Sequence, residues 1–267
     1  MLIEASPIPC IHRVAVDLLT LARDLKRRKA RDRRGVFVAE GVRAIEELLR
    51  SQLSLTGAVV SPLLSSNPRG AALLATITGR DIPVREVTET ELLSASDTEA
   101  PQGVIAIGEI PDRNLDTLLV PAQARLLVLD AIQDPGNLGT LIRTAAAFGA
   151  TATIVLPGTV DPWNAKVVRS SVGAIFRHPV ISCTWEALDV FLKGEAMQLW
   201  GTSREGEPIG EVKFPERLAI AAGNEGGGLS AFARERVSRT IAIPMDPAVE
   251  SLNVAVAAGI LLYAAKP

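Results

Sequence analysis

Short runs of β-branched and aliphatic residues alternate with helical patterns in the first half of the chain. Such runs predict strands at residues 36–38, 58–60, 82–84 and 104–107, and apolar residues at helical spacing predict helices at residues 42–49 and 71–77. This alternation indicates a small α/β domain.

From residue 126 onward the hydrophobic runs are apolar on both faces, as buried parallel strands are. These runs occupy residues 126–129, 153–156, 198–200, 218–222 and 240–243, and helical patterns occupy residues 138–148, 163–172, 185–192 and 253–265. Regular alternation of strand and helix predicts an α/β domain with a parallel sheet covered on both faces. Pro111 and Pro121 bound a segment that is typical of a linker. We therefore expect one domain at residues 1–112, a linker at residues 113–122 and a second domain at residues 123–267.

Composition is that of a globular protein, since 48% of the 267 residues are hydrophobic and 22% are charged. The sequence begins with no basic segment ahead of an apolar run, and no stretch approaches the roughly 18 apolar residues of a membrane span. We therefore expect a cytoplasmic protein. Cys10 and Cys183 lie too far apart for a C-x-x-C pair, and His12 and His178 have no partners at ligand spacing. These spacings predict neither a disulfide framework nor a metal site.

The net charge of -2 conceals a basic run near the N-terminus. Between residues 23 and 34, eight of twelve residues are basic: Arg23, Lys26, Arg27, Arg28, Lys29, Arg31, Arg33 and Arg34. A solvated helix face explains such a run, and so does a surface that contacts nucleic-acid phosphates. The second interpretation gains weight only if the rest of the chain points to RNA.

Three segments rich in Gly, Asn and other polar residues follow predicted strands in the second half. They are residues 130–143 (DAIQDPGNLGTLIR), 218–230 (LAIAAGNEGGGLS) and 243–254 (IPMDPAVESLNV). Taken alone, the third segment needs no function, because Ser251 or Asn253 could simply cap a helix. Ligands of α/β proteins bind at the carboxyl ends of strands, so the three segments together predict one composite site and hence an enzyme.

Asn137 and Arg143 carry the polar chemistry of the first segment. Asp134-Pro-Gly is typical of a turn, so we expect Asn137 at a helix N-terminus and Arg143 on the second turn. Gly139 lies one turn from Arg143 and leaves bare backbone for a ligand or another chain. An Asn cap followed by a surface Arg is the simpler interpretation of this segment alone.

Together the three segments resemble the motifs of the SpoU/TrmH family of 2′-O-ribose RNA methyltransferases, in the SPOUT class. The matching residues are Asn137, Gly139 and Arg143 in the first segment, Gly223 to Gly228 in the second, and Ser251 and Asn253 in the third. In the first half, residues 37–43 (FVAEGVR) and 101–104 (PQGV) resemble that family's appended substrate-binding domain, which is similar to ribosomal protein L30e. The resemblance covers nearly the whole chain from about Lys29.

This resemblance implies a C-terminal SPOUT-type α/β domain with a deep trefoil knot, S-adenosylmethionine as cofactor, and a homodimer with active sites at the subunit interface. The implied reaction centre consists of Arg143, Asn137, Glu225, Ser251 and Asn253. Implied cofactor contacts lie at Thr202, Gly223, Asn224, Gly228, Ile243 and Leu252. Expected RNA contacts are Arg23, Lys26, Arg27, Arg28, Lys29, Arg31 and Arg43.

The implied reaction is transfer of a methyl group from a sulfonium cation to a ribose 2′-hydroxyl. A guanidinium does not readily give up its proton, so we expect Arg143 to grip the adjacent phosphate and orient the hydroxyl. Ribosomal RNA is the favoured substrate, because L30e-like modules recognise folded RNA. Transfer RNA stays open as a substrate, as does a role in antibiotic resistance on the ribosome. A non-catalytic RNA-binding protein is the alternative from a different class, and the retained motif residues argue against it.

Overall fold

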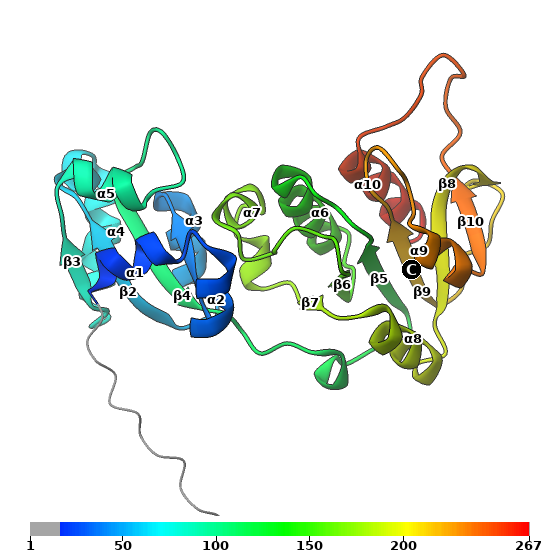
Figure 1. The fold of residues 1–267 in the computed structure, drawn as a ribbon, viewed down its shortest axis with the longest axis horizontal. Helices are drawn as coiled ribbons and strands as arrows, with labels where there is room; N and C mark the ends of the chain where they lie inside the picture. Colours follow the sequence, from blue (N-terminus) through cyan, green and yellow to red (C-terminus); the bar gives the residue numbers. More distant parts are fainter. Residues whose placement is uncertain (1–16, 267) are drawn as a thin grey trace, which may run out of the picture.

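The computed structural model describes residues 17–266, which form two β-sheets joined by a connecting segment (Figure 1). The first sheet has the strand order β1-β4-β2-β3, in which β4 is antiparallel to β1 and β2, whereas β3 is parallel to β2. The elements of this half are α1 (Leu18–Asp24), α2 (Arg28–Arg34), β1 (Val36–Glu40), α3 (Val42–Leu49), β2 (Leu55–Val60), η1 (Pro62–Ser66), α4 (Pro68–Thr78), β3 (Val84–Glu86), α5 (Glu89–Ala95) and β4 (Val104–Glu109).

The second sheet has six strands in the order β10-β8-β9-β5-β6-β7, and each neighbouring pair is parallel. This confirms the predicted parallel sheet. Its half contains η2 (Leu115–Thr117), β5 (Ala124–Leu129), α6 (Pro135–Ala147), β6 (Ala152–Val155), α7 (Ala165–Ser170), η3 (Ala174–Phe176), β7 (Val180–Ser182), α8 (Trp185–Gly194), β8 (Gln198–Pro208), β9 (Arg217–Ala222), α9 (Ala231–Arg236), β10 (Arg239–Ala242) and α10 (Val254–Ala264).

Each strand and helix predicted from the hydrophobic pattern overlaps an observed element. The pattern did not predict α5, β7 and α9, which are only seven, three and six residues long. A signal for α5 was present, because Thr88 and Glu91 form a capping box at its start. Cys10 and His12 lie outside the described residues. The domain boundaries, the trefoil knot and the cytoplasmic location stay predictions; no helix within residues 17–266 is long and apolar enough to cross a membrane.

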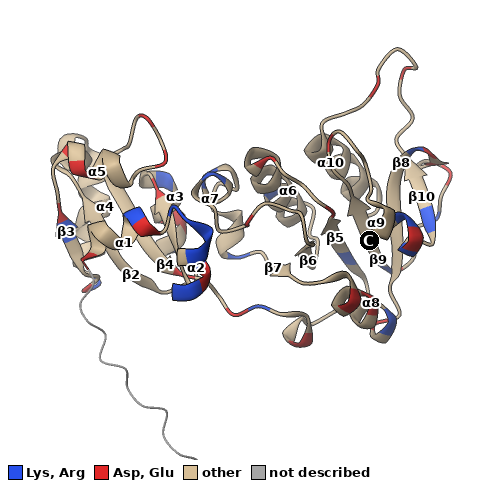
Figure 2. Cartoon of the chain, in the orientation of Figure 1, with Lys and Arg blue, Asp and Glu red and all other residues tan. Residues whose placement is uncertain are grey.

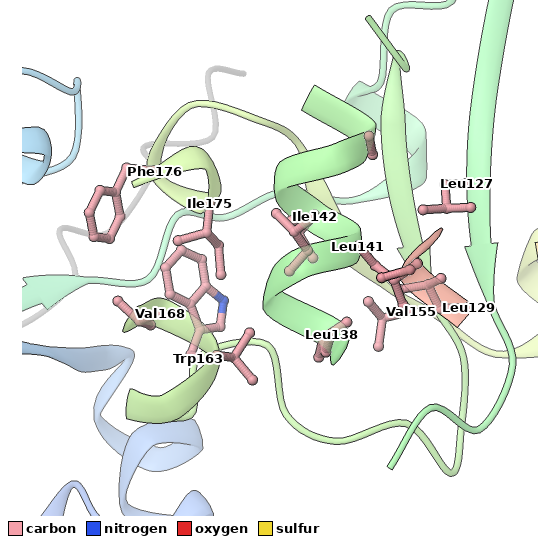
Figure 3. Close-up of a cluster of buried hydrophobic side chains, with 14 of the residues drawn as sticks. Leu127, Leu129, Leu138, Leu141, Ile142, Val155, Trp163, Val168, Ile175 and Phe176 are labelled. Carbon is pink, nitrogen blue, oxygen red and sulfur yellow. The ribbon is translucent and has the colours of Figure 1, made fainter. Parts of the chain in front are cut away.

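One buried hydrophobic cluster extends through the junction between the two halves. Figure 3 shows part of it, running from Leu129 of β5 across Ile142 of α6 to Trp163 and Phe176. Phe37 of β1 belongs to the same cluster, with its ring centroid 4.6 Å from that of Trp163 and 5.7 Å from that of Phe176. Because buried aromatic rings contribute large apolar areas to a core, the two halves share a core at this junction.

A buried ion pair closes the same junction. The guanidinium of Arg31, on α2, donates to the Asp161 carboxylate from Nε at 2.8 Å and also from Nη2. Its Nη1 donates to the carbonyl oxygens of Leu25 and Lys26 at 2.6 and 3.0 Å. Only 4% of the Arg31 side chain is exposed. The prediction that Arg31 contacts RNA is therefore wrong, because its guanidinium is turned inward and bonded within the protein.

We expect Arg31→Gln to lower the free energy of unfolding by about 3 kcal/mol, because it leaves the Asp161 carboxylate buried without its cation. Urea unfolding followed by tryptophan fluorescence measures the change. Lys29→Gln on the same helix is the matched control, since Lys29 is exposed and has no ion-pair partner among the described residues. It should alter stability by no more than about 0.5 kcal/mol. Equal stability of the two variants would contradict the structural role of Arg31.

Candidate active site

Two hydrogen bonds join the segments that follow β5 and β9. The Asp130 carboxylate, 2% exposed, accepts the backbone N–H of Ser230 at 2.6 Å. The Asn224 side chain donates from Nδ2 to the carbonyl oxygen of Ala131 at 3.0 Å. Because β5 and β9 are parallel neighbours, their carboxyl ends lie at one edge of the sheet. The predicted convergence of the first two segments is confirmed.

Asn224 also organises the glycine-rich turn after β9. Its Oδ1 accepts the backbone N–H groups of Gly226 and Gly227 at 2.9 and 3.2 Å, and its carbonyl oxygen accepts that of Gly228 at 2.9 Å. Gly228 adopts a φ of 62°, which favours glycine. Both polar atoms of the Asn224 side chain are therefore occupied within the protein, and its backbone carbonyl oxygen is bonded as well.

The start of α6 differs from the predicted arrangement. Asp134 is the N-cap, and its Oδ1 accepts the backbone N–H of Asn137 at 2.7 Å, while Pro135 occupies the first helical position. Asn137 thus lies inside the first turn and does not cap the helix. Asp followed by Pro is a recognisable cap signal in the sequence. Because Asp134 caps the backbone, the amide side chain of Asn137 is free for other contacts.

Those contacts link all three segments through side chains alone. Asn137 Nδ2 donates to Glu225 Oε1 at 2.7 Å, and Asn137 Oδ1 accepts Asn253 Nδ2 at 2.9 Å. Asn253 also caps α10, since its Oδ1 accepts the backbone N–H of Ala255 at 2.9 Å. The interpretation of Asn253 as a helix cap is therefore confirmed, and its amide nitrogen also contacts Asn137 of the first segment. We call Asn253, Asn137 and Glu225 the amide chain.

The amide chain presents a carboxylate to solvent at its end. Glu225 is exposed, and its Oε2 has no hydrogen-bond partner among residues 17–266. An ionised carboxylate only accepts hydrogen bonds, so Oε2 suits a hydroxyl or amine donor. The other oxygen is held by Asn137, which fixes the orientation of the carboxyl group.

A pocket of about 120 Å³ lies next to the amide chain, between the middle of β8, the end of β10 and the helix α10. Four residues from the predicted site line it: Thr202, Ile243, Ser251 and Leu252. Ser251 therefore lies with the cofactor residues and not with Asn137. The pocket adjoins the amide chain because Asn253 directly follows Leu252 in the sequence.

The wall of this pocket depends on an irregularity in β8. Thr240 of β10 pairs with Gly201, but the next residue, Ile241, pairs with Glu207. Residues 202–206 therefore leave the ladder, and Thr202 reaches the pocket from this excursion. The segment between β10 and α10 loops away from the sheet before α10 returns beside α6 (Figure 1).

Two glycines have neighbours other than those expected. A Cβ on Gly139 would lie 1.9 Å from Ser170 Oγ and 2.7 Å from the Val167 carbonyl oxygen, so α7 covers the backbone that was expected to be bare. A Cβ on Gly223 would lie 2.2 Å from the carbonyl oxygen of Gly228. A side chain at Gly223 therefore collides with its own turn and does not reach into the 120 Å³ pocket, which neither Gly223 nor Gly228 lines.

Arg143 lies apart from the amide chain. Its side chain is exposed on α6 and makes no hydrogen bond or ion pair with another described residue. The neighbouring Thr140 and Thr144 line an open groove of about 500 Å³ between α6 and α10, to which Asn253 also contributes. One copy of the chain thus brings together four of the five predicted reaction-centre residues. Asn137, Glu225 and Asn253 are hydrogen-bonded to one another, and Ser251 lines the adjoining pocket. Arg143 contacts none of them.

The remaining basic positions lie on the surface. Arg23, Lys26, Arg27, Arg28, Lys29 and Arg43 are exposed. Within this set, Arg28 lies 3.6 Å from Asp32, Arg27 pairs with Asp24, and the Lys26 ammonium donates to the Ser94 carbonyl oxygen at 3.0 Å. Such exposed pairs contribute little to stability, so these cations stay available to phosphates.

The titratable groups with large pKa shifts lie away from the amide chain. Burial, with the nearby Arg113 cation, lowers the pKa of His178 to about 4, and its Nε2 lies 2.9 Å from Thr153 Oγ1. Burial raises the pKa of the Cys183 thiol to about 11. His178 is thus a neutral, structural residue near pH 7. Within residues 17–266, no group of three His, Cys, Asp or Glu side chains could hold a metal ion.

Comparison with known proteins matches both halves of the chain. Residues 124–263 match the SpoU rRNA Methylase family, and residues 20–106 match the MRM3-like substrate binding domain. The chain belongs to the SpoU rRNA methylase family. This confirms the resemblance carried by the three motifs and by residues 37–43 and 101–104.

Several relatives cover nearly the whole chain. A 23S rRNA (guanosine(2553)-2′-O)-methyltransferase, RlmP, of Bacillus subtilis is 35% identical over 240 residues, which are 90% of this chain and 92% of the relative. A 23S rRNA (uridine(2479)-2′-O)-methyltransferase of Streptomyces viridochromogenes is 32% identical, covering 90% of this chain and 86% of the relative. The crystal structure of the SpoU methyltransferase AviRb from that organism with AdoMet is similar at a TM-score of 0.82, with 28% identity and 93% and 96% of the two chains covered. An AdoMet-bound rRNA methyltransferase from Sinorhizobium meliloti reaches a TM-score of 0.81 at 27% identity, covering 96% of both chains.

Proposed function

We propose that this chain transfers a methyl group from S-adenosylmethionine to a ribose 2′-hydroxyl of ribosomal RNA. The amide chain carries the proposal, because it joins the three family motifs through side chains and adjoins the 120 Å³ pocket. Relatives named as 23S rRNA 2′-O-methyltransferases support ribosomal RNA over transfer RNA. No observation favours transfer RNA.

The residues around the pocket fit part of the cofactor. Ile243, Leu252 and Leu261 give it apolar walls, and Thr202 and Ser251 supply hydroxyl groups. At 120 Å³ it is smaller than the roughly 300–1,000 Å³ of pockets that enclose a whole drug-sized ligand. The rest of the cofactor would lie along the exposed segments that follow β9 and β10.

The sulfonium group of the cofactor supplies the methyl group. The chain's own task is to place the 2′-hydroxyl, a weak nucleophile, in line with the methyl group. Such positioning can lower the activation free energy by a large amount. Glu225, fixed by Asn137, would hold the ribose through Oε2. Arg143 would grip the neighbouring phosphate with its planar fork and orient the hydroxyl. Asn253 holds Asn137 and at the same time fixes the start of α10.

Transfer of tritium from methyl-labelled S-adenosylmethionine to 23S rRNA transcribed in vitro tests the function. Mapping 2′-O-methyl sites in RNA from cells with and without the protein identifies the nucleotide. Cofactor binding with no transfer to ribosomal RNA would refute the proposal and favour a non-catalytic RNA-binding protein. Transfer only to transfer RNA would refute the substrate assignment alone.

We further propose a homodimer formed through α6 and α10. The eleven residues of α10 include no charged residue. One side packs on α6, while Val256, Ile260 and Tyr263 remain 52%, 37% and 69% exposed along the 500 Å³ groove. A second copy of the chain is the occupant we assign, because Arg143 follows Thr140 and precedes Thr144 on α6, both of which line this groove, and is the motif residue that one copy leaves outside the site.

Arg143→Ala should reduce turnover by about two orders of magnitude or more, because a lost positioning contact acts in the transition state. The affinity for S-adenosylmethionine should stay within a few-fold, since Arg143 does not line the cofactor pocket. Arg143→Lys should restore little, because an ammonium lacks the planar fork. Single-turnover kinetics and calorimetry measure the two quantities, and a lysine variant with a near-normal rate would defeat the assignment.

Replacing Lys26, Arg27, Arg28 and Lys29 together with Gln should weaken RNA binding and flatten its salt dependence by up to roughly four phosphate contacts. All four side chains are exposed on or beside α2. Filter binding of 23S rRNA at several salt concentrations gives the slope. An unchanged slope would return this run to the interpretation of a solvated helix face.

Ile260→Asp should convert the protein from a dimer to a monomer of 28.3 kDa, because it places a carboxylate in the apolar groove. Analytical ultracentrifugation measures the mass. Val190→Asp is the matched control: Val190 is 74% exposed on α8, outside the groove, and its variant should keep the wild-type mass. A wild-type protein that sediments as a monomer at micromolar concentration would overturn the proposal.

A further inference from the structure

A second cavity of about 300 Å³ lies at the junction of the two halves, away from the amide chain. Its N-terminal wall comes from the start of α3, including Arg43, and from the segment that contains Ala100 and Gln102. The opposite wall comes from Arg169 and Val172, on and just after α7. Residues 37–43 and 101–104 thus contribute to one cavity. None of the proposed reaction-centre residues lines it.

The polar groups around this cavity include two cations with unfilled donors. Arg169 Nη1 is buried and has no hydrogen-bond partner, and it lies 3.9 Å from Glu40 Oε2. That distance is too long for a hydrogen bond. The Glu40 carboxylate is already bonded, to the Ser96 hydroxyl at 2.9 Å and to the Asp97 backbone N–H at 2.7 Å. A buried donor without a partner is costly, so Arg169 points to an acceptor that enters the cavity.

Arg43 and Gln102 add donors on the facing wall. Arg43 is exposed and forms no ion pair within the described part of the chain. Gln102 Oε1 accepts the backbone N–H of Val42 at 2.9 Å, which leaves the amide nitrogen of Gln102 free to donate. Guanidinium groups on two sides of a cavity suit a phosphate, which accepts forked hydrogen bonds from Arg.

The cavity connects to the reaction centre through one short helix. Lys166 lies three residues before Arg169 on α7, so the two side chains are neighbours on the helix surface. The Lys166 ammonium is 3.8 Å from the carboxylate of Asp134, the cap of α6, and the Ser170 hydroxyl donates to the Pro135 carbonyl oxygen at 3.2 Å. Figure 2 shows basic positions on α2, α3 and α7 on both sides of the junction. Arg43, Arg169 and Lys166 thus mark a path from the first half to the turn that carries Asn137.

We propose that this cavity binds one nucleotide of the RNA substrate, distinct from the nucleotide that is methylated. Arg43 and Arg169 hold its phosphate, and the apolar surfaces of Ala100 and Val172 contact its ribose or base. The inference rests on the proposed function, since it assigns a second subsite for the same RNA. Phosphate contacts position a nucleic acid without reading its sequence, so the subsite sets the register of the RNA relative to the reaction centre.

Arg43→Gln and Arg169→Gln test the subsite, with Arg50→Gln as the matched control. Arg50 lies at the end of α3, outside the cavity, and its side chain is 65% exposed. Each cavity variant should weaken binding of 23S rRNA transcribed in vitro by about tenfold and reduce the salt slope by roughly one phosphate contact. The affinity for S-adenosylmethionine should not change. Arg50→Gln should match the wild type in all three measurements.

Ala100→Phe is a second variant that tests the subsite even if Arg169→Gln does not fold. It fills the cavity from an exposed loop without removing a charge, and it should weaken RNA binding to a similar extent. Adenosine 5′-monophosphate should show no saturable binding below about millimolar concentration, because one nucleotide lacks the contacts of the rest of the RNA. The inference is overturned if the cavity variants bind RNA as Arg50→Gln does, or if the free nucleotide binds tightly while RNA affinity is unaffected. Absence of methyl transfer by the wild type would instead refute the proposed function.

Discussion

The contact between α6 and α7 at Gly139 is the constraint on which the arrangement of the two halves depends. There is no space for a side chain at this position, because Ser170 and the backbone of Val167 already fill it. From this contact α7 leads towards the N-terminal half, where Trp163 packs on Phe37 and Arg169 approaches Glu40. Asn137 lies two residues before Gly139 on α6. A larger residue at Gly139 would therefore displace the substrate-binding half relative to the reaction centre, as well as loosening a helix pair.

The proposed reaction centre is built from residues that also hold the backbone. Asp134 caps α6 and thereby frees Asn137, while Asn253 caps α10 with its oxygen and holds Asn137 with its nitrogen. In the amide chain, the side-chain nitrogen and oxygen of both Asn137 and Asn253 are hydrogen-bonded. The Glu225 carboxyl group is therefore oriented before any substrate arrives. Preorganised polar groups need no reorganisation during reaction. In the proposed function, the same residues are then required for folding and for chemistry.

Strand positions were predictable because they follow from the periodicity of hydrophobic residues along the chain. The convergence of the three segments was predictable because it follows from the geometry of parallel sheets. Contacts between distant residues were not. Arg31 belongs to a basic run, and only the fold places it against Asp161, 130 positions later, so composition alone assigned it wrongly to RNA. The neighbours of Gly139 and Gly223 could not be predicted either. A glycine in a motif indicates that another group lies close to its backbone, but the sequence does not show which group this is. Nothing in the sequence indicated that Arg169 lines a cavity, because a single Arg in a helical pattern is usually interpreted as a surface residue.

Arg143 gives an argument for the proposed homodimer that is independent of apolar area. Asn137 and Arg143 are six residues apart on α6, and at 3.6 residues per turn their side chains point about 120° apart around the helix axis. A single helix cannot present both to one ribose. In a two-fold symmetric pair, however, each copy repeats the same contact in the opposite sense, so α6 can offer Asn137 to its own site and Arg143 to its partner's. Asn253 and the neighbours of Arg143, Thr140 and Thr144, line the groove between α6 and α10 together, so the proposed dimer would bring the two sets of residues within reach there. Dimerisation would then be a requirement of the chemistry, because one copy alone lacks the guanidinium that the three motifs imply.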